Sequence, residues 1–518
     1  MLSAIATSQG LSNRLPMLEP TSVITPGDRL DWPGLSKAAL IFIAAFVLYF
    51  LSRSPGLDEY DSVQFAMGVR DFNIWAHQPH PPGYPLFIFF GWIGYTFFRL
   101  SPEVSLYLVS SLGGALFVAS WFLIIRLQFN ERVAWWITAC LVITPAVWMT
   151  ATKVLTDPLA AGFLSAEILA ALCFVRSGRL LPLVSASLFG AAAAGARPQL
   201  ILVIMVILAT ALAQRRSGWP KWMLAFGTLV SACLLWLLPM WYLQARLKPD
   251  IPPWLVYPKL LYDQWRWRLD KPHVYLGAGD WSPRYLGLRL GEHIFGWFGL
   301  GFGLLQSKLV LGIGAIVLVA GFAAYFLADR DAQDRGFWKL HAPWSLVHFT
   351  TIFISLDGAQ RYYLIIFPLL LVALMQGFLR LPAPWHRSAF ALPALLLFIG
   401  IPLAMTNHSE EAPPIRLVHY LQKLYPSAQR SQVILLLHSA KRHADWYAPE
   451  FTVIDPIPPP EKMKELTKDA TAVYTDDDTA PLPPGWRRIS LIEFRRSLVI
   501  YIKHHLIRLY LIDRGSNR

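Results

Sequence analysis

Apolar residues occur along this chain in long blocks, with short polar stretches between them. Many of the blocks are about 17 to 23 residues long, close to the ~20 residues that a helix needs to cross a bilayer. Buried strands are also apolar, but they run for only about 4 to 8 residues. The pattern therefore predicts an α-helical polytopic membrane protein.

The blocks predict about eleven membrane-spanning helices. Their approximate ranges are 38–52, 104–126, 133–152, 158–176, 180–196, 198–213, 222–243, 308–328, 340–356, 363–380 and 388–405. A further block, 84–100, is short and contains Tyr84, Trp92 and Tyr95, residue types that are enriched at membrane surfaces. We predict that this block lies along the interface and does not cross.

Clustered arginine and lysine residues fix the expected orientation. They occur in the loops 176–179, 214–221 and 329–339, and such residues favour the cytoplasmic side. The polar N-terminal segment 1–36 has no apolar signal-peptide core, so we place it on the same side.

This orientation brings the chemically distinctive segments to the outer face. They are the first loop 53–84, the turns at Asp157 and Arg197, the loop 244–307, the "LDGAQRYY" turn that contains Arg361, and the C-terminus. Because the charge bias was applied only to the other loops, this convergence supports the assignment independently.

Three regions are expected. The cytoplasmic segment 1–36 precedes a transmembrane domain, 37–405. In the remaining region, 406–518, segments such as "IRLVHYLQKLY", "SQVILLLHS", "FTVIDPIPPP", "EKMKELTKD" and "TAVYTDDD" alternate between helix-like and strand-like patterns. We predict a small α/β domain on the outer (periplasmic) face.

Composition agrees with a membrane protein. Of the 518 residues, 55% are hydrophobic and 15% are charged, whereas soluble proteins carry roughly a quarter charged residues. The formal net charge of +13 is typical of nucleic-acid-binding proteins, but the basic residues lie in short loops and form no single stripe. We therefore expect no nucleic acid as a partner.

Three acids, Asp58, Glu59 and Asp61, directly follow the first predicted helix. If a helix begins near Asp58, the side chains of Asp58 and Asp61 fall on one face. Neighbouring carboxylates at a membrane surface suit a general base or the binding of a cation. For any one of them, an N-cap that opens a short interfacial helix is an equally good interpretation.

The stretch "HQPHPPGYP", 77–85, combines two histidines with prolines and a glycine. The prolines stiffen the backbone and Gly83 permits a tight bend. Such a loop holds His77 and His80 at low entropic cost, and an imidazole there could donate to a phosphate or bind a metal. Two histidines beside an acidic cluster favour a functional role over a structural one.

Five further residues with polar side chains lie near predicted helix ends. Asp157, in "LTDPL", follows Lys153 by one turn, and an N-cap role before a proline is compatible with a catalytic one. Arg197 in "GARPQL" and Arg361 in "DGAQRYY", followed by Tyr362, lie at later helix ends. These arginines either snorkel to the surface or bind a lipid phosphate.

The loop 244–307 is both aromatic and basic, as in "WRWRLDKPHVYLGAGDWSPRYLGLR". Aromatic and basic residues interleave in single-stranded nucleic-acid sites, but an outer membrane face argues against that ligand. An interfacial belt that contacts membrane lipid and receives an anionic headgroup fits better. Arg284 is therefore a candidate substrate-binding residue.

The first outer loop resembles that of the type C glycosyltransferases. "LDEYDSVQFAMGVRDF" and "HQPHPPGYPLF" are similar to the Asp-Glu pair and the His-Pro-Pro segment of the dolichyl-phosphate-mannose protein mannosyltransferase and aminoarabinose transferase group of bacterial membrane enzymes. "LTDPL" resembles the site of a second acid, and "GARPQ" and "QRYYLIIFPLL" resemble later helix ends. The resemblance extends over roughly 36–405 in layout.

The resemblance implies a type C glycosyltransferase fold and transfer of a sugar, with inversion, from a polyprenyl-phosphate donor. It implies that the first-loop acid is the catalytic base, which falls on Asp58, with Glu59 and Asp61 beside it and Asp157 as the second acid. His77, His80, Lys153, Arg197, Arg284, Arg361 and Tyr362 are the candidate substrate-binding residues. A metal site of the family is not carried over, because no matching ligand set is evident; a divalent cation stays open.

The expected partners are the lipid-linked sugar donor and a lipid, glycan or protein acceptor, at the periplasmic face of a bacterial inner membrane. The main alternative is a transporter or flippase for lipid-linked saccharides. Transporters usually contain repeated halves and broken helices that meet at the midplane. This sequence has no evident repeat, and its acids lie at helix ends. A ligase for lipid-linked saccharides remains a chemically close alternative.

Overall fold

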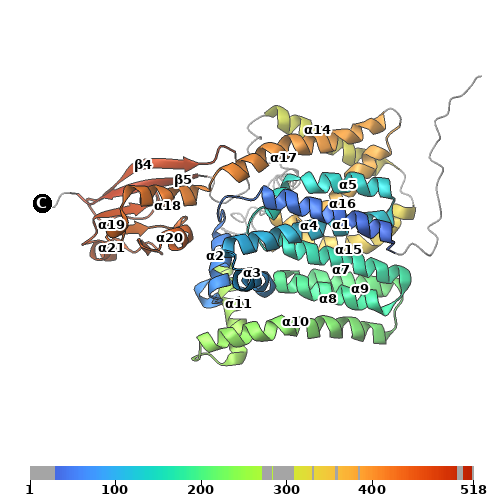
Figure 1. The fold of residues 1–518 in the computed structure, drawn as a ribbon, viewed down its shortest axis with the longest axis horizontal. Coiled ribbons are helices and arrows are strands. Elements are labelled where there is room, and N and C mark those ends of the chain that lie inside the picture. Colours follow the sequence, from blue (N-terminus) through green and yellow to red (C-terminus); the bar gives the residue numbers. More distant parts are fainter. Residues whose placement is uncertain are drawn as a thin grey trace, which may run out of the picture.

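The computed structural model describes residues 30–270, 283, 287, 308–328, 332–355, 360–382, 385–498 and 506–515. A bundle of helices carries a small α/β unit at one end (Figure 1). The predicted fold class, a polytopic helical protein with a small C-terminal α/β unit, is confirmed.

The helical part consists of long helices and a few short 3₁₀ turns. The α-helices are α1 Trp32–Leu51, α2 Tyr60–Arg70, α3 Pro85–Phe97, α4 Pro102–Gln128, α5 Glu131–Ile143, α6 Pro145–Ala151, α7 Asp157–Ser177, α8 Leu180–Ala196, α9 Ile201–Gln214, α10 Trp219–Leu247, α11 Pro253–Asp270, α14 Lys308–Leu327, α15 Ala332–Ser355, α16 Phe367–Leu379 and α17 Ala391–Ser409. The 3₁₀ helices are η1 Ile74–Ala76, η2 Pro198–Leu200, η4 Gln360–Tyr363 and η5 Trp385–Phe390.

Contacts between distant segments define the two ends of the bundle. At the first-loop end, the loop after α1 contacts α4 near its start and the residue that ends α6, and Arg197 after α8 pairs with Asp157 at the start of α7. At the opposite end, Arg126 pairs with Asp31, and Gln214 Nε2 donates to the carbonyl oxygen of Lys339 at 2.8 Å. The basic loops therefore gather away from the first loop, as the charge pattern predicts.

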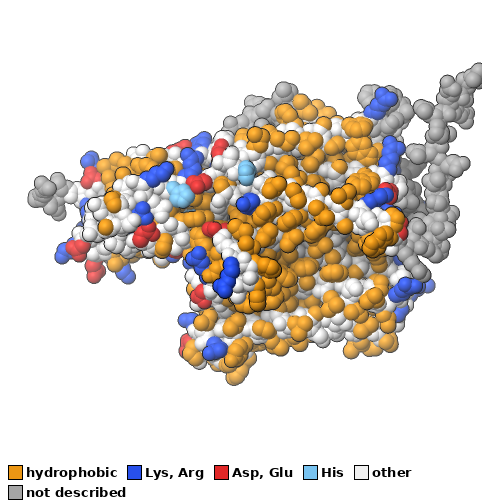
Figure 2. Space-filling view, in the orientation of Figure 1, with side chains coloured by type: hydrophobic (Ala, Val, Ile, Leu, Met, Phe, Trp, Pro, Cys, Tyr) orange, Lys and Arg blue, Asp and Glu red, His pale blue; other side chains and the backbone are white. Residues whose placement is uncertain are grey.

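Several helices run between the two ends (Figure 1). They are α1, α4, α5 with α6, α7, α8, α9, α10, α14, α15, α16 and α17. Taken singly, five described helices are long and apolar enough to cross a membrane, and the pair α5–α6, bent by 56°, makes a sixth if it is one span. Figure 2 shows a mainly hydrophobic surface along this part, with charged side chains toward its ends. The chain is thus built as an integral membrane protein.

Helix α3 does not carry the chain across. It begins beside Tyr84, whose hydroxyl contacts His80 of the first loop. The next helix, α4, also begins at the first-loop end, because Glu103 in its first turn accepts a hydrogen bond from Trp446 of the C-terminal unit. The block 84–100 therefore returns to the end at which it started, in agreement with the prediction.

Local sequence explains where several helices begin and bend. The side chains of Asp31, Ser101 and Asn130 each accept a hydrogen bond from a backbone N–H in the first turn of α1, α4 and α5. Pro145 separates α5 from α6, because a proline cannot continue the hydrogen-bonding ladder of a helix.

Helices α4 and α7 pack closely near the first-loop end. A Cβ atom at Gly113 would lie 2.4 Å from the backbone of Leu159, and one at Gly162 would lie 2.6 Å from the carbonyl oxygen of Gly113. Small residues allow such close approach of two helices. The contact fixes the start of α7, and with it Asp157.

We expect Gly113→Ala to destabilise the protein, by about 1 to 3 kcal/mol, because the added methyl group meets backbone and not a flexible side chain. The measurement is thermal unfolding in detergent. Gly227→Ala on α10 is the matched control, since a Cβ there meets nothing within 4 Å. Equal unfolding temperatures for the two variants would contradict the close packing.

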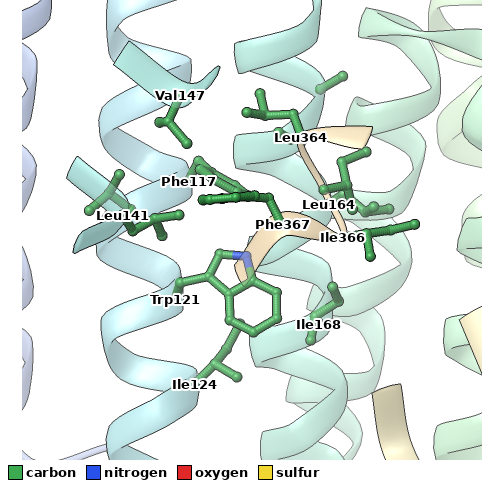
Figure 3. Packing of buried hydrophobic residues seen from close by; sticks show 14 of the residues in the cluster. Phe117, Trp121, Ile124, Leu141, Val147, Leu164, Ile168, Leu364, Ile366 and Phe367 are labelled. Carbon is green, nitrogen blue, oxygen red and sulfur yellow. The ribbon is translucent and has the colours of Figure 1, made fainter. Parts of the chain in front are cut away.

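The core extends beneath the segment that follows η4. Figure 3 shows Phe117 and Trp121 of α4 and Leu164 of α7 packed with Leu364 and Phe367. All five side chains are buried. Burial of the residues after η4 anchors the preceding turn, which carries Arg361 and Tyr362.

The C-terminal unit is a five-stranded mixed sheet with helices. Its strands are β1 Val433–Leu436, β2 Thr452–Ile454, β3 Ala472–Thr475, β4 Arg487–Arg495 and β5 Leu506–Asp513, in the order β2-β1-β3-β5-β4. Its helices are α18 Pro413–Leu424, α19 Ser427–Arg430, α20 Lys441–Tyr447 and α21 Pro460–Leu466. β1 is parallel to β2 and β3, and β5 is antiparallel to β3 and β4.

Candidate active site

A cavity of about 530 Å³ opens at the first-loop end. Its polar wall includes His80, Tyr84, Asp157, Arg197 and Arg361. The remainder is largely apolar and comes from α9, α10, α11, α15 and the segment after η4. The cavity therefore combines a cluster of charges with a hydrophobic lining.

The charged groups form a chain of alternating sign. Arg361 Nη2 donates to Asp61 Oδ2 at 2.8 Å, and Arg361 Nε lies 4.0 Å from Asp157 Oδ2. Asp157 in turn accepts a hydrogen bond from Arg197. Four separate segments thus contribute Asp61, Arg361, Asp157 and Arg197 to one group, as the predicted convergence requires.

Tyr362 lies between the two arginines. The Arg197 guanidinium stands 4.4 Å from the centre of its ring, and the Arg361 guanidinium 5.3 Å from it. Cations over an aromatic face are held electrostatically. The backbone carbonyl of Tyr362 also contacts His348 Nε2 of α15 at 2.9 Å, and this contact helps to hold the turn in place.

Asp157 is the first residue of α7, and its carboxylate faces Arg197 and Arg361. The N-cap position belongs to Thr156, whose side chain makes no capping hydrogen bond. The N-cap interpretation of Asp157 is therefore wrong by one position. Its carboxylate instead pairs with the two arginines of the cavity wall.

The proline-rich loop holds His80 firmly. Its Nδ1 lies 2.7 Å from Gln64 Oε1, and its Nε2 lies 2.9 Å from the Tyr84 hydroxyl. Because the Gln64 oxygen is an acceptor, Nδ1 carries the proton and Nε2 accepts from Tyr84. Asp61 Oδ1 is 4.0 Å from the same ring.

His77 lies apart from the cavity wall. It ends η1 in the left-handed conformation, with φ 57°. Burial lowers its pKa, and the positive charge of Arg442 lowers it further. The two histidines that the sequence analysis grouped together thus have different surroundings.

We expect His80 to destabilise the fold in acid. Burial lowers the pKa of His80 to about 4, although Asp61 opposes the shift. The unfolded chain binds this proton near pH 6.5, so stability is intact above that value and is lost as the pH falls from about 6.5 toward 4. The unfolding temperature of the wild type should fall more steeply over this interval than that of His80→Gln.

The control for this experiment is His438→Gln, which changes an exposed histidine of the C-terminal unit. It should retain the pH dependence of the wild type. Parallel curves for the wild type and His80→Gln would show that His80 does not titrate with unfolding.

Asp58, Glu59 and Asp61 are not among the residues that line the cavity, but Asp61 pairs with Arg361 of its wall. Helix α2 begins at Tyr60, after Asp58 and Glu59, so Asp58 and Asp61 do not share a helical face. The side chain of Asp58 is fully buried, whereas that of Asp61 is 32% exposed. The expected common face was wrong because the helix begins two residues later than the pattern suggested.

The two buried acids are held by a lysine and by the C-terminal unit. Lys153 Nζ lies 3.7 Å from Asp58 Oδ2 and 3.6 Å from Glu59 Oε1. Arg496 binds Asp58 with both guanidinium nitrogens, each at 3.0 Å. Burial raises the pKa of Glu59, against the effect of Lys153. Lys153 is thus part of a closed ion-pair group.

Arg284 and most of the aromatic and basic stretch around it lie outside the described residues. Sequence reasoning missed Gln64, His348 and Arg496 as members of this region. A glutamine on a helix, a histidine within a predicted span and an arginine after a strand carry no local signal, because only the fold brings them here. Within the described ranges, no group of three or more His, Cys, Asp or Glu residues is arranged to hold a metal ion.

The bundle with its first-loop site and C-terminal unit has the type C glycosyltransferase fold. Among solved structures it is similar to ArnT from Cupriavidus metallidurans, with a TM-score of 0.53 and 14% identity over 92% of this chain and 98% of that chain in the apo state. The structure of the same protein bound to undecaprenyl phosphate gives a TM-score of 0.52 and 13% identity over the same shares, 92% and 98%.

The oligosaccharyltransferase of Archaeoglobus fulgidus, in its apo form, is also similar, with a TM-score of 0.50 and 13% identity over 86% of this chain and 69% of that chain. No protein-family model and no curated protein matches the sequence. At these identities the likeness establishes the fold, and it confirms the resemblance inferred from the first loop.

Proposed function

We propose that the protein is an inverting glycosyltransferase that moves a sugar from a polyprenyl-phosphate donor to a hydroxyl-bearing lipid, glycan or protein acceptor. The observation that carries the proposal is the cavity, whose lining combines Arg197 and Arg361 with largely apolar residues. A phosphate attached to an isoprenoid chain matches both features. The fold adds support, since a protein of this fold has been solved with undecaprenyl phosphate bound.

Arg361 and Arg197 would bind the donor phosphate. Guanidinium groups bind phosphate oxygens in a forked geometry, and the contact strengthens as charge develops on the departing phosphate. Their partners, Asp61 and Asp157, hold both groups in place before the donor arrives. The apolar residues of α9, α10 and α15 would accommodate the first isoprene units.

Asp61 is the best candidate for the general base. It is next to Arg361 and its side chain is 32% exposed, whereas the side chain of Asp58 is closed off by Arg496. We therefore move the proposed base from Asp58 to Asp61, within the same first-loop cluster. Asp157, with 6% of its side chain exposed, is proposed to orient the arginines.

In the proposed step, the acceptor oxygen forms a bond to the anomeric carbon from the face opposite the phosphate. The bond between that carbon and the phosphate oxygen breaks, and its electron pair leaves with the polyprenyl phosphate. The hydroxyl proton passes to Asp61. Attack from the opposite face inverts the anomeric configuration.

The remaining expectations follow from this assignment. The transmembrane domain, 37–405, would carry the catalytic loop 53–84 and the loop 244–307, and the region 406–518 would contact the acceptor. The first-loop end would face the periplasm of a bacterial inner membrane, with the basic loops and residues 1–36 in the cytoplasm.

The proposal is tested with purified protein in lipid nanodiscs. Radiolabelled polyprenyl-phosphate sugars are supplied with membrane lipid and protein extracts as acceptors, and empty nanodiscs are the control. Label in an acceptor together with release of polyprenyl phosphate is the expected result. Movement of intact labelled donor between vesicle leaflets without any transfer would favour the transporter alternative.

A further inference from the structure

The C-terminal unit forms hydrogen bonds with the backbone of the first loop just before α2. Leu57 N–H donates to the Tyr447 hydroxyl at 2.9 Å, and the Leu57 carbonyl contacts His443 Nε2 at 2.9 Å. Both partners belong to α20. Further along the loop, Arg442 donates to the carbonyl oxygen of Ala76 at 3.2 Å. One short helix thus touches the loop near its beginning and near its proline-rich part.

Arg496, directly after β4, makes the strongest of these contacts. Its two terminal nitrogens bind the two oxygens of Asp58, at 3.0 Å each, and both side chains are fully buried. Nη2 also donates to the carbonyl oxygen of Glu410 at 2.7 Å. A bidentate pair of this kind fixes orientation as well as distance.

The formal charges of Asp58, Glu59, Lys153 and Arg496 sum to zero. Asp58 and Glu59 are two negative groups, and Lys153 supplies one positive group from the loop between α6 and α7. Without Arg496 the group would carry an excess buried negative charge, which is costly because the interior solvates charge poorly. The segment from Asp58 to Asp61 would then have to shift.

We propose that Arg496 is a positioning residue for the first loop: by pairing with Asp58, three residues before Asp61, it sets the start of α2. The C-terminal unit is then a part of the site that acts through the loop. The inference rests on the proposed transferase function for its activity readout, but the pairing itself is tested separately. It also accounts for the closed surroundings of Asp58.

The first test compares Arg496→Met with Arg495→Met, which removes the neighbouring, exposed arginine of β4. We expect Arg496→Met to lower kcat by about 100-fold, the loss typical of a misplaced catalytic group, with little change in KM for the donor. Arg495→Met should match the wild type. Should Arg496→Met not insert in the membrane, Arg496→Lys is the substitute, because lysine retains the charge but cannot bind both oxygens of Asp58 as a guanidinium does. We expect a smaller fall in kcat, again with little change in KM.

The second test is rescue. Asp58→Asn combined with Arg496→Met removes both charges and leaves Lys153 paired with Glu59. We expect the double variant to be about tenfold more active than Arg496→Met alone, which corresponds to roughly 1.4 kcal/mol. A double variant no better than Arg496→Met, although folded, would overturn the proposal, because Asp58 would then act in its own right. Unchanged or raised activity in Arg496→Met would also overturn it.

The third test does not need activity. Amide hydrogen exchange of residues 54–70 should be faster in Arg496→Met than in the wild type and in Arg495→Met. If the wild type transfers no sugar, the transferase function fails, and this measurement still decides whether Arg496 holds the loop. Identical exchange in all three proteins would overturn the positioning role.

Discussion

Asp61→Asn is expected to lower kcat by about 10²- to 10⁴-fold, the contribution typical of a general base. The amide keeps the size of the side chain and an oxygen that can accept from Arg361, so the cavity wall should persist. The proton of the acceptor hydroxyl would have no receiving group. The measurement is single-turnover transfer from a labelled polyprenyl-phosphate sugar in nanodiscs, with donor affinity measured in parallel.

Asp71→Asn is the matched control, because Asp71 is an exposed acid just after the same helix. It should transfer sugar at the wild-type rate. Comparison of Asp61→Asn with Asp58→Asn shows which of the two first-loop acids is the general base. One outcome would show that the base is Asp58 and that our reassignment is wrong. In that outcome, Asp61→Asn keeps the wild-type kcat, whereas Asp58→Asn loses activity although amide hydrogen exchange of the first loop is unchanged.

Arg361→Gln is expected to weaken binding of undecaprenyl phosphate by about 30- to 100-fold, or roughly 2 to 3 kcal/mol. The guanidinium is the group that contacts both Asp61 and Asp157, and glutamine supplies neither the charge nor the fork. Binding is measured by displacement of a fluorescent polyprenyl phosphate. Because the same contact stabilises the departing phosphate, kcat should fall as well.

The control for this variant is Arg179→Gln, at an exposed arginine of the opposite end of the bundle. It should bind the lipid phosphate as the wild type does. An unchanged dissociation constant in Arg361→Gln would place the phosphate elsewhere and remove the main support for the donor site.

Most of the helical layout could be predicted because it follows from block length alone. The block 84–100 illustrates the reasoning: with residues 1–36 inside, the basic loops fall on the same side as this segment only if one early block fails to cross. The block 84–100 was the best candidate, and α3 indeed starts and ends at the first-loop end. In the C-terminal unit, the helix-like and strand-like segments from 415 to 478 coincide with α18, β1, β2, α21 and β3. The final two strands were not predicted individually.

The site could be predicted as a set of segments but not as a set of contacts. Charge and turn patterns place Asp61, Asp157, Arg197 and Arg361 at one end, and the structure joins them. Which first-loop acid pairs with Arg361 of the cavity wall depends on where α2 begins, and one residue of difference turns a side chain by about 100°. The pairing of Asp58 with Arg496 depends on tertiary structure, for which the local sequence holds no signal.

The 438 residues that separate Asp58 from Arg496 have a consequence for biosynthesis. The ribosome delivers the first loop at the beginning of translation, whereas its buried partner emerges only after the membrane helices and β4 have been made. A nascent chain can thus insert its bundle long before the loop reaches its final geometry. Under the proposed function and the positioning role of Arg496, sugar transfer would reach its full rate only once synthesis has passed Arg496, so half-made enzyme would consume little of the lipid donor.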